Sequence, residues 1–136
     1  MAEHTLIGMH SSPSHVILDY LDSLAPAEPL TPASGPDRRK VLMYAGIASA
    51  SADKMVTVLY EYHFRPPEKV YRPWIKMCEQ QIQDGFVWLN SKINEGRLVG
   101  NTLTQADISA AVYWQFAQEK RPSFCERMNC PQLQAL

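Results

Sequence analysis

The chain has 136 residues, enough for one domain of ordinary size and too few for two. Hydrophobic residues make up 46% and charged residues 20%, and the formal net charge of −1 excludes a generally basic surface of the nucleic-acid-binding kind. No apolar run approaches the roughly 20 residues that span a bilayer, and no cationic start leads into an apolar stretch, so we expect neither a membrane span nor a secretion signal.

The first 36 residues predict a short strand, a helix and a linker. Residues 5–9 read as a strand, but no second strand follows nearby to pair with it. Residues 14–24 predict an amphipathic helix with Ser14 as a good N-cap. Residues 25–36 contain four prolines among small residues, which is typical of a semi-rigid linker between two structural units.

Three long helices are predicted to form the rest of the chain, over residues 37–64, 71–94 and 104–120. Apolar residues recur on one face of each of the first two, at alternating spacings of three and four. Gly96 and Gly100 are expected to end the second helix and turn the chain. Short helical pieces follow at 123–128 and 131–136, and the short connections predict an all-α bundle of antiparallel neighbours. The predicted stripes are Val41, Ala45, Ala48, Ala52, Met55, Leu59 and Tyr62, and Trp74, Cys78, Ile82, Phe86, Leu89 and Ile93.

The hexapeptide of residues 103–108, Leu-Thr-Gln-Ala-Asp-Ile, predicts a helix start. Thr104 and Asp107 have the spacing of a capping box, in which each side chain binds the backbone amide of the other residue. Leu103 and Ile108 occupy the two positions of a hydrophobic staple. We therefore expect a structural N-cap at Thr104 and Asp107.

This hexapeptide resembles the N-capping motif of cytosolic glutathione transferases, in which a buried helix of the C-terminal domain opens with Thr or Ser followed three residues later by Asp. Upstream, Val16-Ile17-Leu18-Asp19-Tyr20-Leu21 before the Pro-rich linker resembles the last helix of that family's thioredoxin-like domain. The resemblance covers nearly everything from Ser14 to Leu136 and is closest to bacterial members with a Ser-Pro pair near the N-terminus.

The resemblance implies an all-α domain with a remnant of a thioredoxin-like α/β domain. Residues 1–24 would be the remnant, 25–36 the linker, and 37–136 the glutathione transferase C-terminal-like domain. Residues 6–13 resemble the family's first strand and the turn with the catalytic Ser or Cys, and the junction near Pro13 and Ser14 then reads as an internal deletion. The family also continues through a further helix beyond Leu136. Whether the missing segment is absent from the natural product stays open.

By the same resemblance, Ser12 would be the catalytic residue, donating a hydrogen bond to the glutathione thiolate, with Ser11 as the alternative. Ser14 would bind the γ-glutamyl carboxylate at the N-terminus of its helix. Pro13 stands where the family usually has an acidic residue. The competing interpretations are a flexible N-terminal tail around Ser12 and a helix N-cap without ligand at Ser14.

The histidines and cysteines predict no metal site. His10 and His15 have no partner acids, and Cys125 and Cys130 lack a second ligand pair. Three cysteines cannot all pair in one chain, so reduced thiols in the cytoplasm are expected. Core packing or the lining of an electrophile pocket is expected for five aromatic residues: Trp74, Trp88, Tyr113, Trp114 and Phe116.

The implied function is conjugation of the glutathione thiolate to small apolar electrophiles, weak or absent in this shortened chain. Glutathione would be a co-substrate, and no cofactor is expected. The alternative is a non-catalytic helical protein-interaction module. The resemblance also implies a homodimer, because the family pairs its subunits through the helices after the linker, here near residues 37–52, and against the first domain of the partner. Loss of most of the first domain would expose apolar faces on residues 16–24 and along the stripe of residues 41–59, and the small residues 46–52 would let two chains approach closely.

Overall fold

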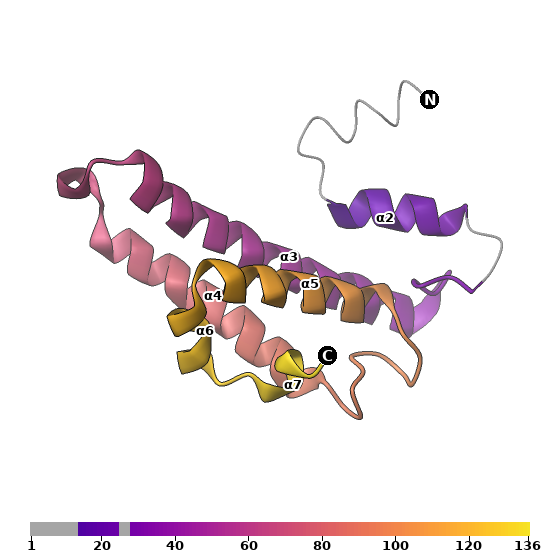
Figure 1. Cartoon of the computed structure of the whole chain (residues 1–136). Coiled ribbons are helices and arrows are strands. Elements are labelled where there is room, and N and C mark those ends of the chain that lie inside the picture. Colours follow the sequence, from indigo (N-terminus) through magenta and orange to yellow (C-terminus); the bar gives the residue numbers. More distant parts are fainter. Residues whose placement is uncertain (1–13, 25–27) are drawn as a thin grey trace, which may run out of the picture.

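The computed structural model describes residues 14–24 and 28–136, and these form an all-helical fold (Figure 1). The predicted all-α domain is confirmed, whereas the predicted strand of residues 5–9 lies outside the described residues. Each helix begins and ends within two residues of its predicted bounds. The elements are α2 (Ser14–Ser23), α3 (Gly35–Phe64), the 3-10 turn η1 (Pro67–Lys69), α4 (Arg72–Lys92), α5 (Gln105–Lys120), α6 (Pro122–Met128) and α7 (Pro131–Gln134).

The three long helices α3, α4 and α5 form the body of the fold (Figure 1). α3 packs along α4, to which η1 joins it at one end, and α5 packs along α3. α6 and α7 follow α5 and close the bundle against α5 and α4. α2 stands beside the first part of α3, at the opposite end of the bundle from η1.

The core confirms most of the predicted stripes. Val41, Ala48 and Met55 of α3 belong to one buried cluster with the apolar face of α4 and the small residues that begin α5. Phe86 and Trp114 pack edge to face, with ring centroids 5.3 Å apart. The end of the α3 stripe was predicted wrongly: Tyr62 is exposed and Leu59 is only partly buried, while Val58 is fully buried. The predicted stripe repeats every 3.5 residues on average, whereas an α-helix has 3.6 residues per turn. The buried positions therefore shift by about one residue relative to the prediction along the 30 residues of α3.

Small residues of α3 allow close packing of helices within the chain. Ala45, Ala48 and Ala52 are buried in the chain's own core. Gly85 of α4 crosses Ser51 so closely that a Cβ atom at Gly85 would lie 2.0 Å from the Ser51 Oγ. One side of this segment thus packs on α4 and α5 of the same chain, while Gly46, Ser49 and Ala50 stay partly or fully exposed, and the expected close approach of a second chain stays a prediction.

The turn between α4 and α5 uses the two predicted glycines. Gly96 has a φ of +74° and Gly100 a φ of +64°, values that side chains with a Cβ rarely adopt. Asn94 and Arg97 pair their backbones across the first of these turns. None of the helices in residues 14–24 and 28–136 has the length and apolarity that crossing a bilayer requires.

Candidate functional site

The start of α5 is built around the carboxylate of Asp107, which is only 2% exposed. Thr104 and Asp107 form a capping box. Asp107 Oδ2 accepts hydrogen bonds from the Thr104 amide at 2.8 Å and from the Thr104 hydroxyl at 3.0 Å. Asp107 Oδ1 accepts a third bond, at 2.8 Å, from the amide of Leu98 in the preceding turn. The carboxylate is thus surrounded by donors of its own chain, which fits a structural group rather than a proton-transfer group.

The linker is tied to both α2 and α5. The Asp22 carboxylate accepts bonds from the amides of Leu30 at 2.9 Å and Thr31 at 2.7 Å. The Leu30 carbonyl accepts a bond from the Gln105 amide at 2.9 Å. Sequence analysis predicted only a semi-rigid spacer here, because prolines and small residues carry no signal of which distant groups they meet.

An ion pair fastens α2 to α3. Arg38 donates two hydrogen bonds to the Asp19 carboxylate, at 3.0 and 2.8 Å, and a third to the Pro32 carbonyl at 3.2 Å. The bond to Asp19 is the main cause of a raised pKa of Arg38. A pocket of about 420 Å³ lies next to the pair, lined by Asp19, Asp22, Ser23, Pro29, Thr31, Ala33 and Arg38.

The two serines implied by the family resemblance are placed only in part. Ser12 lies outside the described residues. Ser14 is the first residue of α2, and its side chain also lies outside the described part of the chain. Its position at a helix N-terminus is the one that favours an anionic ligand group, since the first amides of a helix point outward unpaired.

Of the five aromatic residues singled out in the sequence, Trp114 is buried and the other four pack on the core partly exposed. Trp114 also lines a pocket of about 250 Å³ between α5, α6 and α7. Its indole N–H is buried, and the described residues offer it no hydrogen-bond acceptor. Sequence periodicity could not single out this pocket, whose other lining residues are Gln118, Pro122, Cys125, Glu126, Asn129, Cys130, Pro131 and Gln134.

All three cysteines are buried free thiols. Burial raises the pKa of Cys125 to about 11, with a further contribution from Cys130, and burial likewise raises the pKa of Cys130 to about 11. A reactive cysteine needs the opposite shift, toward thiolate. Within the described residues, no group of three His, Cys, Asp or Glu side chains could hold a metal ion.

Comparison with solved structures identifies the fold. Two crystal structures of a glutathione transferase family member from Pseudomonas fluorescens Pf-5, one with bound glutathione and one with bound S-(propanoic acid)-glutathione, match this chain with a TM-score of 0.80 at 31% sequence identity. In both matches 90% of this chain is covered. The chain therefore shares the fold of these glutathione transferase family members over nearly its whole length. Its helical body is the C-terminal-like domain of that family.

The other comparisons show how much of such a protein the chain matches. A glutathione S-transferase from Methylobacterium radiotolerans JCM 2831, solved with glutathione sulfonate, has the same fold, with a TM-score of 0.82 at 22% identity over 90% of this chain. The present chain spans 62% and 59% of the two Pseudomonas chains and 58% of the Methylobacterium chain. No protein-family model and no curated protein sequence matches the chain.

Proposed function

We propose that the chain is a glutathione transferase-like protein that, with a complete glutathione-binding domain, joins glutathione to small apolar electrophiles. The observation that carries the proposal is the match over 90% of the chain, at 31% identity, to a family member solved with glutathione and with a glutathione thioether. In the reaction, the glutathione thiolate forms a carbon–sulfur bond, and the electrophile releases its leaving group or takes up a proton. The 136 residues by themselves are expected to catalyse this weakly or not at all.

The residues proposed to act on glutathione lie at the N-terminal side. Ser12 would donate a hydrogen bond to the thiolate and so favour it over the thiol. Ser14 would hold the γ-glutamyl carboxylate with its hydroxyl and the first amides of α2, an anion site supported by its place at the helix start. Residues 1–24 are proposed as the remnant of the glutathione-binding domain, and the body from residue 37 as the helical domain.

Binding of glutathione and conjugation test the two serines separately. Titration calorimetry with glutathione measures binding, and the absorbance of a glutathione–dinitrobenzene adduct measures conjugation. Ser14→Ala should weaken binding about tenfold or more, because a charge-assisted contact is lost. Ser12→Ala should lower the conjugation rate and leave binding nearly unchanged.

Ser23→Ala is the matched control, a serine at the other end of α2 whose exposed hydroxyl bonds only the Tyr20 carbonyl. It should change neither binding nor rate. Absence of any glutathione binding by the wild-type chain at millimolar concentration would refute retained glutathione recognition in these 136 residues.

A non-catalytic helical interaction module is the second candidate function. The observation that favours it is the number of large apolar side chains left exposed on α2 and at the end of α3. Retention on immobilised glutathione would favour the transferase-like function, and flow-through would favour the interaction module. A cytoplasmic homodimer is proposed for either function, since exposed apolar faces commonly find a second copy of the same chain.

A further inference from the structure

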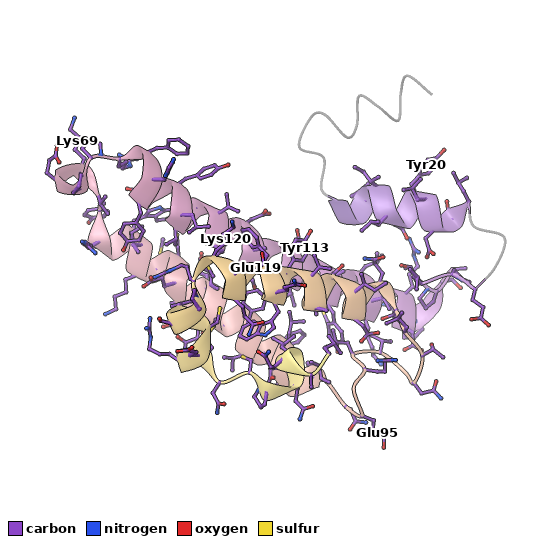
Figure 2. The ribbon with its side chains drawn as sticks, viewed as in Figure 1. Tyr20, Lys69, Glu95, Tyr113, Glu119 and Lys120 are labelled. Atoms are coloured by element: carbon purple, nitrogen blue, oxygen red, sulfur yellow. The ribbon has the colours of Figure 1, made fainter. Side chains whose placement is uncertain are left out.

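The last part of the chain folds back on α5 and encloses a small pocket. Figure 2 shows the chain leaving α5 after Glu119 and Lys120 and returning beneath that helix, in this view, as α6 and α7. The pocket between these three helices has a volume of about 250 Å³. Drug-sized ligands usually occupy pockets of about 300–1,000 Å³, so this pocket suits a smaller molecule.

Two buried thiols line this pocket. Cys125 belongs to α6, and Cys130 stands immediately before α7. Asn129, with a φ of +51°, ends α6 in the left-handed conformation and turns the chain, so that Cys130 lines the same pocket as Cys125. The charge on Cys130 contributes to the raised pKa of Cys125, as expected of two sulfurs that lie close together. The pocket therefore offers a pair of thiols to a ligand.

The same pocket holds a hydrogen-bond donor without an acceptor. Trp114 is 4% exposed, and its buried indole N–H has no acceptor among the described residues. The amide side chains of Gln118 and Gln134, which also line the pocket, are hydrogen-bonded to each other. Buried polar groups in folded proteins are nearly always paired with protein groups or bound molecules. A ligand that binds both thiols and carries one acceptor oxygen would match all three groups.

The chemistry of these groups favours an uncharged ligand over a metal cation. Zn²⁺ binds thiolates and usually takes four ligands. Burial raises the pKa of Cys125 and of Cys130 to about 11, so both thiols carry their protons at neutral pH. Within residues 14–24 and 28–136, no three His, Cys, Asp or Glu side chains are grouped to hold a metal ion. Arsenous acid, As(OH)3, is uncharged at neutral pH and reacts with protonated thiols.

We propose that Cys125 and Cys130 form a dithiol site for trivalent arsenic, with the Trp114 N–H as donor to the one oxygen that arsenic keeps. In the binding step, two As–O bonds and two S–H bonds break, and two As–S bonds form. Each released hydroxyl group takes the proton of one thiol and leaves as water. Arsenic stays trivalent, so the step needs neither an oxidant nor a reductant. The site does not depend on the proposed glutathione chemistry.

Equilibrium dialysis against sodium arsenite in thiol-free buffer tests the site, with bound arsenic measured by mass spectrometry. The wild type should bind one arsenic per chain. Cys125→Ala and Cys130→Ala should each weaken binding roughly a hundredfold, because a second attachment within one molecule typically raises affinity by about 10²–10⁴. Cys78→Ala is the matched control, a buried thiol on α4 that does not line the pocket, and it should bind like the wild type. Far-UV circular dichroism checks that the variants keep their helices.

A second variant tests the indole N–H. Trp114→Phe keeps an aromatic ring but has no donor, so it should weaken arsenite binding several-fold. Phenylarsine oxide bound to two thiols keeps no hydroxyl group, so its affinity should be nearly the same for Trp114→Phe and the wild type. Arsenite binding that is unchanged in Trp114→Phe would overturn the role of the N–H.

Thermal unfolding of the wild type separates a site of the folded chain from capture of thiols in unfolded chains. A ligand raises Tm when it binds the folded state more tightly and lowers Tm when it binds the unfolded state more tightly. Arsenite should raise the Tm of the wild type and of Cys78→Ala. A lowered Tm of the wild type would overturn the folded dithiol site, and so would equal arsenite affinity of Cys125→Ala and Cys78→Ala.

Discussion

Removing the Asp107 carboxylate should destabilise the fold more than any loss of a simple helix cap. In Asp107→Ala, the amides of Leu98 and Thr104 both lose their acceptor. Both residues are buried, so water does not readily replace the lost bonds. The substitution therefore disconnects the turn after α4 from the start of α5.

The magnitude follows from the number of buried donors left unpaired. Each costs about 1–3 kcal/mol, so the loss of two acceptors in Asp107→Ala should lower the free energy of unfolding by roughly 2–6 kcal/mol. Asp107→Asn keeps one acceptor oxygen, but its NH2 group faces the second of the two backbone amides. The free energy of unfolding should therefore fall by about half as much as in Asp107→Ala. Thr104→Ala should cost about 0.5–2 kcal/mol, the ordinary range for a lost cap.

Urea unfolding followed by circular dichroism measures these differences, with Asp84→Ala as the control. Asp84 is an exposed carboxylate whose side chain bonds only the Gln80 side chain on the same helix. Its loss should change stability by about 0.5 kcal/mol or less, as for most surface positions. If Asp107→Ala were as stable as Asp84→Ala, the bridging role of the buried carboxylate would be refuted.

Four further predictions concern the helix packing and the thiols. Gly85→Ala should destabilise by about 1–3 kcal/mol in urea unfolding, because its Cβ would lie 2.0 Å from Ser51 Oγ, and adding Ser51→Ala should recover much of the loss. Ala48→Arg should abolish cooperative thermal unfolding, because Ala48 is fully buried and the substitution places an unpaired charge in the core. Cys125 and Cys130, with pKa values raised from 9.0 to about 11, should react with iodoacetamide at pH 8 far more slowly in the folded chain than in urea. Because the folded state holds these protons more tightly, their contribution to stability should be complete below about pH 9 and fall as pH rises toward 11.

Local features of this protein could be predicted from sequence because the groups involved lie within a few residues of each other. The capping box needs only the spacing of Thr104 and Asp107, and the turns need only Gly96 and Gly100 where φ is positive. The long helices could be predicted because a buried face repeats every three or four residues. The resemblance carried by these motifs led to the family, and it supplied the proposed roles of Ser12 and Ser14, which no helical periodicity could indicate.

Tertiary structure decided which distant groups meet. Asp107 also binds the Leu98 amide, Arg38 reaches Asp19 across 19 residues, and the linker meets α5 through Leu30. No local spacing encodes such pairs, because they exist only once the helices are packed. The same holds for the apolar faces: sequence shows that α2 and α3 each have one, but only packing shows that the face of α3 is covered by α4 and α5 while the face of α2 stays open.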